Sequence, residues 1–139
     1  MVQRDFTHAE ILTLVSNSPI TLLTPPPRSY PIFWQLCIGL RKVGATPYAN
    51  FTPGAPVSGA RATLEFGSAL GGIDMAEVCL QMLENFVFAG AFIDAPVGGS
   101  APLRLVVTNG GLGNFTGGDQ GDVMRVMVPF FMFYDPLSF

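Results

Sequence analysis

The sequence predicts an all-β domain in which antiparallel strands form a sandwich or a barrel. Three stretches alternate between apolar and mixed positions, as strands with one buried face do: residues 32–43, 60–66 and 103–108. Segments rich in Gly, Pro, Asn and Ser separate the strands at intervals of about ten to twenty residues, which is typical of turns in such folds. The 139 residues suffice for one domain with its own core.

A short helix is expected before the first of these strands. Thr7 and Glu10 have the spacing of a capping box, in which each side chain accepts a hydrogen bond from the other residue's amide. The apolar residues that follow lie at helical spacing: Ile11, Leu14 and Val15. Pro19 ends the segment. We therefore expect residues 1–19 to form an N-terminal arm with a short helix, and residues 20–139 to form the β domain.

Within the alternating stretches, one set of positions is expected to face the core. In residues 32–43 these are the even positions: Ile32, Trp34, Leu36, Ile38 and Leu40. The later strands repeat the pattern with Ala62, Leu64, Phe66, Leu103, Leu105 and Val107. Residues 86–93 are apolar on both faces, which predicts a strand buried on both sides or lying in an interface. Residues 74–84 have a helical pattern and predict one short mid-chain helix.

The strand expected over residues 123–134 has two apolar faces. Its even positions, from Met124 to Tyr134, satisfy the core, and Arg125 marks the odd face as the outer one. That outer face also carries Met127, Phe131 and Phe133, which cost roughly 1.5 to 3 kcal/mol each to leave in water. Pro129 favours an edge or a bulge. Either loops or the N-terminal helix of the same chain cover this face, or another subunit does, and we favour the subunit.

The composition supports such a contact. Hydrophobic residues make up 49 % of the chain and charged residues 12 %, against roughly 25 % charged residues in ordinary soluble domains. Surplus apolar surface is typical of assembly interfaces. The residues expected at an assembly interface lie in the N-terminal helix, the last strand and the C-terminal tail: Ile11, Leu14, Val15, Met127, Phe131, Phe133 and Phe139.

Several partners and locations are not expected. The net charge is −3 and the seven Lys and Arg are scattered, so we expect no nucleic-acid partner. No apolar run is long enough to span a bilayer, and the N-terminus lacks the apolar core of a signal peptide. Cys37 and Cys79 do not form a disulfide framework, and two free thiols in a reducing compartment are the favoured interpretation.

The sequence offers few residues for catalysis, and we expect no enzyme, no cofactor, no metal and no small-molecule substrate. His8 is the only histidine, so neither a Ser-His-Asp triad nor a multi-histidine metal site is indicated. The glycines of residues 110–118 lack the Lys-Ser/Thr and the helix of a phosphate-binding loop. Asp119 and Asp122 are close enough to share a cation, but helix or turn capping is the favoured role.

Three stretches resemble small jelly-roll virion proteins of tailed bacteriophages, which are often decoration or cement proteins of the capsid. Residues 6–27 (FTHAEILTLVSNSPITLLTPPP) are similar to that family's capped helix, Pro-Ile-Thr-Leu strand and Pro-containing turn. Residues 36–67 contain GATPYA and end in ATLEFG, and residues 102–134 join two strands through an Asn- and Gly-rich loop ending in GGD. The final strand is more apolar than in the family, and Pro25-Pro26-Pro27 is a stiffer turn, which suggests apolar contacts particular to this chain.

The resemblance implies an antiparallel jelly-roll β-sandwich over residues 20–139 that self-associates as a homodimer or homotrimer. It implies a structural virion protein, made in the host cytoplasm, that sits on the capsid surface, contacts a major capsid protein and stabilises the phage head. The alternative is a receptor- or glycan-binding jelly-roll module of a phage fibre or tail. For that role Asn50, Phe51, Asn114 and Phe115, in the loops 44–59 and 109–122, are the residues best placed to bind a sugar.

Overall fold

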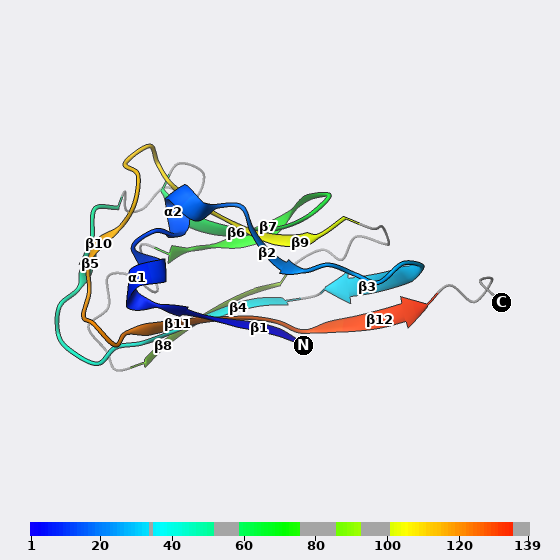
Figure 1. Cartoon of the computed structure of the whole chain (residues 1–139), viewed down its shortest axis with the longest axis horizontal. Helices are drawn as coiled ribbons and strands as arrows, with labels where there is room; N and C mark the ends of the chain where they lie inside the picture. Colours follow the sequence, from blue (N-terminus) through cyan, green and yellow to red (C-terminus); the bar gives the residue numbers. More distant parts are fainter. Residues whose placement is uncertain (34, 52–58, 76–85, 93–100, 135–139) are drawn as a thin grey trace.

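The computed structural model describes residues 1–33, 35–51, 59–75, 86–92 and 101–134. These residues form twelve strands and two single-turn helices (Figure 1). In chain order the elements are β1 (Val2–Thr7), α1 (His8–Ile11), α2 (Leu14–Asn17), β2 (Ile20–Leu23), β3 (Ser29–Phe33), β4 (Gln35–Arg41), β5 (Tyr48–Ala49), β6 (Ala60–Phe66), β7 (Ser68–Asp74), β8 (Phe86–Phe92), β9 (Leu103–Asn109), β10 (Thr116–Gly117), β11 (Val123–Val128) and β12 (Phe130–Tyr134). The predicted all-β class is confirmed.

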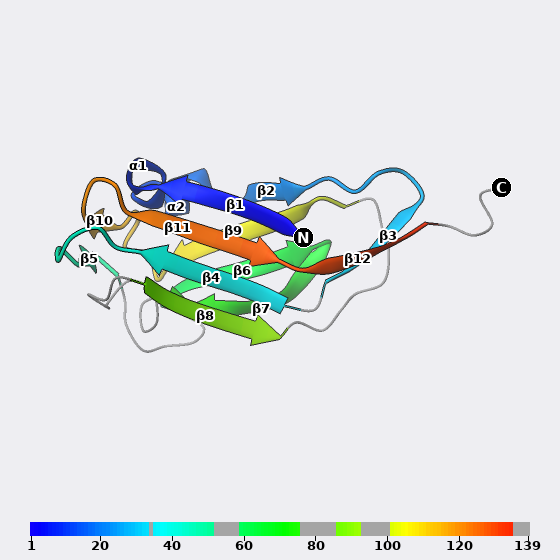
Figure 2. The same ribbon diagram turned by 90° about the horizontal axis from the view of Figure 1, so that it is seen from below.

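Two four-stranded antiparallel sheets face each other and form the body of the molecule (Figures 1 and 2). One sheet has the strand order β1-β11-β4-β8 and the other the order β2-β9-β6-β7. Two smaller ladders lie at opposite ends of this body: β10 pairs with β5, and β12 pairs with β3. We call the β3–β12 pair the ribbon. In Figure 1 it projects to the right, beyond the two sheets.

The core lies between the sheets and follows the predicted alternation. In β6 and β9 the positions expected inward are buried and their neighbours are partly or fully exposed. The two strands are antiparallel, with Leu64 opposite Leu105, so both strands present their apolar side chains to the same layer. On the other sheet the buried side chains come from β1, β4 and β11: Phe6, Leu36, Ile38, Leu40, Met124, Val126 and Val128.

The N-terminal residues belong to the body rather than forming a separate arm. Residues 2–7 make strand β1, which pairs along its whole length with β11. The capping box is present, with the Thr7 amide donating to Glu10 and the Glu10 amide to Thr7. Instead of one helix of about two turns, the chain forms the separate turns α1 and α2. Helices this short persist only through packing, and here that packing is against the two sheets.

The long strands predicted over residues 32–43 and 123–134 are each divided in two. Pro129 separates β11 from β12, and β3 ends at Phe33 before β4 begins at Gln35. The inward positions also change: Phe33 is buried while Ile32 is half-buried, although Leu36 and the following even positions are buried as predicted. A one-residue shift of this kind exchanges the two faces of a strand. Trp34 lies outside the described residues, as do residues 76–84 of the mid-chain helix predicted over residues 74–84. Asp74, the expected first residue of that helix, is the last residue of β7.

Candidate assembly interface

The ribbon is anchored to the core at one end by Phe33. The Phe33 ring makes an edge contact with Phe66, at 5.2 Å between ring centroids, and lies 5.7 Å from the Phe130 ring. Phe33 itself is fully buried and Phe130 is half-buried. These aromatic contacts fix the base of the ribbon to the body, and only the part of the ribbon beyond them projects.

Beyond this base the ribbon exposes large apolar side chains. Phe131, Phe133 and Tyr134 are 64 %, 55 % and 65 % exposed. Neither strand of the ribbon contains a charged residue, since β3 reads SYPIF and β12 reads FFMFY. Solvent-exposed apolar side chains that gather on one element mark interaction sites more often than scattered ones do. The sequence predicts an outer position for Phe131 and Phe133, and both are exposed in the structure.

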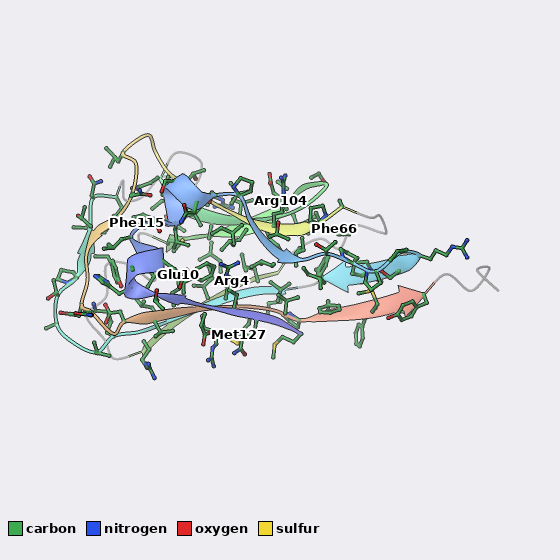
Figure 3. All side chains as sticks on the ribbon, in the orientation of Figure 1. Arg4, Glu10, Phe66, Arg104, Phe115 and Met127 are labelled. Atoms are coloured by element: carbon green, nitrogen blue, oxygen red, sulfur yellow. The ribbon has the colours of Figure 1, made fainter. Side chains whose placement is uncertain are left out.

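Met127 belongs to β11, the strand that precedes β12 along the chain, and it lies on the outer face of the body (Figure 3). It is half-buried, and it is paired with Gln3 of β1 and Cys37 of β4. Two residues earlier the same face becomes polar, because Arg125 binds both carboxylate oxygens of Asp5 at 2.7 Å. The hydrogen bond from Arg125 holds the pKa of Asp5 below its usual value. The outer face thus changes from charged to apolar toward the ribbon.

Two of the residues expected at an assembly interface are instead buried in the chain's own core. Ile11 and Leu14 are 0 % and 1 % exposed, so they have no surface to offer a partner. Their helical turns close one end of the space between the sheets. Val15 is half-buried and lines an open depression of about 490 Å³ with residues 106–111 of β9 and its following turn. Phe139 lies outside the described residues.

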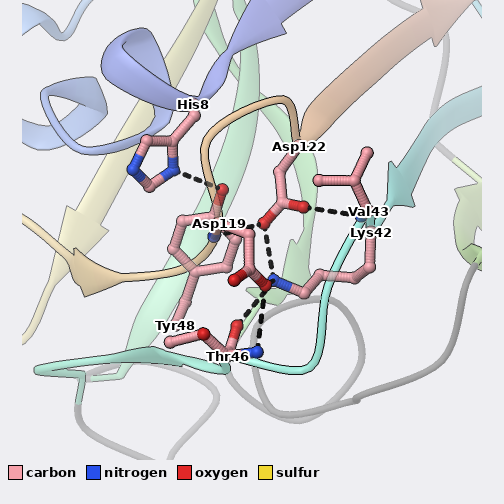
Figure 4. Close-up of polar contacts among 7 residues, drawn as sticks. All are labelled: His8, Lys42, Val43, Thr46, Tyr48, Asp119 and Asp122. Carbon is pink, nitrogen blue, oxygen red and sulfur yellow. Dashed lines mark hydrogen bonds and ion pairs between the residues drawn. The ribbon is translucent and has the colours of Figure 1, made fainter.

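At the opposite end of the molecule from the ribbon, the loops are joined by buried charges (Figure 4). The ammonium of Lys42 lies 2.5 Å from Asp122 and 3.1 Å from Asp119, and it donates to the carbonyl of Thr46 at 2.6 Å. The side chains of Lys42 and Asp122 are both inaccessible to solvent. Asp122 also accepts from the amides of Val43 and Asp119, and Asp119 accepts from the amide of Thr46. We call Lys42, Thr46, Asp119 and Asp122 the ionic cluster.

Hydrogen bonding keeps both carboxylates of the ionic cluster ionised. Burial alone would raise the pKa of Asp122, but the hydrogen bonds from Lys42 and from the amides of Asp119 and Val43 outweigh burial and lower it. The pKa of Asp119 is lowered by a hydrogen bond from the Thr46 side chain, with further contributions from Lys42 and the Thr46 amide. The cation shared by the two aspartates is therefore the chain's only lysine. Asp122 also caps the turn between them by accepting from the Asp119 amide, whereas Asp119 binds the Thr46 amide of the other loop.

Tyr48 connects the ionic cluster to the N-terminal helical turn. Its hydroxyl lies 3.2 Å from Nδ1 of His8, and Lys42 Nζ lies 4.9 Å from the centre of its ring. Burial and the nearby Asp122 charge raise the pKa of Tyr48. Gly118, at φ +73°, is needed here because a Cβ at that position would overlap the Tyr48 ring. His8, the one candidate base in the sequence, is thus engaged with a tyrosine hydroxyl.

The loop residues named for sugar binding are used inside the chain. Phe115 is 2 % exposed, and Phe51 is half-buried against the core. The Asn50 side chain donates to the carbonyls of Leu112 and Asn114, and the Asn114 side chain accepts from the Ser16 amide. These contacts tie the two loops to each other and to α2, and they leave Phe115 enclosed and Phe51 only partly exposed at this rim.

Other features of the sequence have simple positions in the structure. Cys37 is buried with a free thiol, and burial raises its pKa; Cys79 lies outside the described residues. Within the described ranges, no three His, Cys, Asp or Glu side chains come together as a metal site would require. The described helices include none long and apolar enough to cross a membrane.

Two features of the site were not predicted from the sequence: the ionic cluster and the projection of the ribbon. The available signals for the ionic cluster were Lys42, which continues the inward positions Leu36, Ile38 and Leu40, and the short spacing of Asp119 and Asp122, for which capping was the favoured role. The projection of the ribbon was signalled by Pro129 alone. Comparison with known proteins adds nothing to these features: no protein-family model, no curated protein and no solved structure significantly matches this chain.

Proposed function

We propose that this chain is a non-enzymatic structural protein of a virion, a capsid decoration or cement protein of a tailed bacteriophage. In this role it is made in the host cytoplasm, binds the capsid surface, and contacts copies of itself and a major capsid protein. The observation that carries the proposal is the ribbon, which holds exposed Phe131, Phe133 and Tyr134 away from the body on an element without charge.

The order of the strands supports a jelly-roll fold, which viral capsid domains commonly use. Following the chain, β1, β4, β8 and β11 belong to one sheet and β2, β6, β7 and β9 to the other. Apart from the β6–β7 hairpin, each connection between these strands therefore passes from one sheet to the other. This alternation between sheets is what two interleaved Greek keys, the topology of a jelly roll, would give. The resemblance of residues 6–27, 36–67 and 102–134 to phage jelly-roll proteins points to the same fold.

The physical mechanism is mass action. A protein that binds only the assembled form of a shell stabilises that form by RT ln(1 + [L]/Kd), which is about 2.7 kcal/mol per site at a hundredfold excess over Kd. Apolar aromatic surface suits this role because its burial is favourable without a specific chemical partner. The ionic cluster holds the loop end of the body together by itself, so the exposed aromatic side chains of the ribbon are not needed for this purpose.

The proposal is tested on particles of the virus or prophage that encodes the chain. We expect mass spectrometry to find the protein in purified virions, and cryo-electron microscopy to show a two-sheet body on the capsid with the ribbon in contact with a neighbour. A chain with Phe131 and Phe133 both changed to Ser should fold but fail to bind particles that lack the native protein. Virions without the protein, or full binding by the double variant, would refute the proposal.

A further inference from the structure

The two edges of the ribbon differ in their hydrogen-bonding capacity, and Pro31 is the reason. Pro31 of β3 lies opposite Met132 of β12 in an antiparallel ladder. Opposed residues in such a ladder alternate between pairs that exchange two hydrogen bonds and pairs that exchange none. Since proline has no N–H, the pair of Pro31 and Met132 belongs to the second kind. The residues of β12 that bond to β3 are therefore Phe131 and Phe133.

It follows that the backbone groups of alternate residues in β12 point away from β3. Phe130, Met132 and Tyr134 direct their N–H and C=O groups to the outer edge of the strand, and none of them is a proline. On the outer edge of β3 the equivalent central position is Pro31, which has no donor. In the described part of the chain, β12 pairs with β3 alone. A strand added to the ribbon would therefore join β12 and not β3.

The strand best suited to pair with the outer edge of β12 is β12 of a second copy of the chain. Its outward groups are symmetric about Met132, so an antiparallel copy places each outward N–H opposite an outward C=O. Met132 then meets Met132 of the second copy, and Phe130 meets Tyr134. Phe131 lies opposite Phe133 in the closely spaced pairs, on the exposed face, where aromatic pairs stabilise a sheet. No charge lies on either strand to repel the copy.

The exposed aromatic area limits how much apolar surface this contact can bury. The exposed parts of Phe131, Phe133 and Tyr134 in two copies amount to about 700 Å² of aromatic surface, given 150–250 Å² for each whole ring. The strand edges and the half-buried Met132 add to this area. Since a stable interface needs roughly 1,000 Å² or more, the pairing lies at the small end of the range. The arrow of β12 points away from the body (Figure 1). Antiparallel pairing therefore places the second body at the far end of the ribbon.

We propose that two copies of this chain join through their β12 strands, in an antiparallel pair centred on Met132, to form a continuous four-stranded ribbon with a body at each end. This proposal depends on the proposed function in one respect: both take the ribbon as the surface through which the chain assembles. Its symmetry is a two-fold axis, which closes the assembly at two copies through this surface.

A single cysteine at the axis tests the pairing. In the variant Met132→Cys the two sulfurs face each other, with Cα atoms about 5.5 Å apart in a hydrogen-bonded pair, within the range that a disulfide spans. The matched control is Phe130→Cys, whose copies would lie about 13 Å apart at 3.3 Å per residue. The unsubstituted chain, which retains Cys37 and Cys79, gives the background.

We expect mild oxidation to give a disulfide-linked dimer of Met132→Cys on a non-reducing gel, at least tenfold more than for Phe130→Cys or the unsubstituted chain. Sedimentation equilibrium of the unsubstituted chain should show a dimer. A monomer or a trimer, or equal cross-linking at both positions, would overturn the pairing. A monomer that still binds capsids would leave the proposed function standing, whereas a cross-linked dimer absent from virions would remove that function and leave the pairing.

Discussion

The two ends of the molecule differ in whether the chain itself satisfies the side chains that are costly to place there. At the loop end, Lys42 is fully enclosed by its own chain, with Asp119, Asp122 and the Thr46 carbonyl as partners. At the ribbon end, Phe131 and Phe133 are more than half exposed. The first end satisfies a costly buried charge internally, while the second leaves apolar surface in water. The difference indicates that the loop end serves the fold and the ribbon end serves a partner.

The largest effect is expected from removing the lysine of the ionic cluster. Lys42→Met leaves the inaccessible Asp122 carboxylate without its cation, and breaking a buried pair in this way costs about 3–5 kcal/mol. The matched control is Arg4→Met, which removes an exposed pair with Glu10 at 4.0 Å and should cost less than about 1 kcal/mol. Urea unfolding measures both changes. Equal losses in the two variants would mean that the cluster does not stabilise the loop end.

A second comparison divides the ribbon into its base and its exposed part. Phe33→Ala removes a fully buried ring that contacts Phe66 and Phe130, and should lower the free energy of unfolding by about 3 kcal/mol. Phe131→Ala should change it by less than about 0.5 kcal/mol when measured on dilute monomers, because surface substitutions away from the core have small effects. If Phe131→Ala destabilises the monomer as much as Phe33→Ala, its ring serves the fold and not a partner.

These two ends also show where sequence reasoning succeeds. The alternation in β6 and β9 was predictable because each strand has one buried and one wetter face, so the period of two is visible in the sequence. The Thr7–Glu10 capping box was predictable because it is local. The buried Lys42 was harder to anticipate, since its partners are 77 and 80 residues away along the chain. The pattern near residue 42 shows an inward lysine but not what surrounds it.

The assembly surface was predictable only in part, because an apolar side chain does not reveal which molecule covers it. Ile11 and Leu14 have the helical spacing of a docking face, yet they pack into the core of their own chain. In β12 the apolar residues occupy both faces, so the alternation gives no signal that the strand leaves the body. Phe131 and Phe133 were identified because Arg125 fixed the outer face of the preceding strand.

The third comparison uses acid, which separates the buried pair of the loop end from exposed ion pairs. The folded-state pKa of Asp122 and that of Asp119 are both lowered, so their contribution to stability is present above the unfolded-state pKa near 3.9. It is lost as the pH falls through their folded values, because protonation is then favoured in the unfolded chain first. Urea unfolding between pH 7 and pH 2.5 should therefore show stability falling below about pH 4.

The variant Asp122→Asn assigns this acid sensitivity to the ionic cluster. Relative to the unsubstituted chain, its stability should be lower at pH 7 and should fall less between pH 5 and pH 2.5, because the buried carboxylate no longer takes up a proton. Asp5→Asn is the matched control, since the Asp5 pKa is also lowered, but by the solvent-exposed Arg125. Added salt should weaken the contribution of Asp5 far more than that of Asp122, because salt screens exposed pairs and scarcely reaches enclosed ones. If Asp122→Asn leaves the acid profile unchanged, the pKa of Asp122 does not differ between the folded and unfolded chains, and the contrast between the two ends fails.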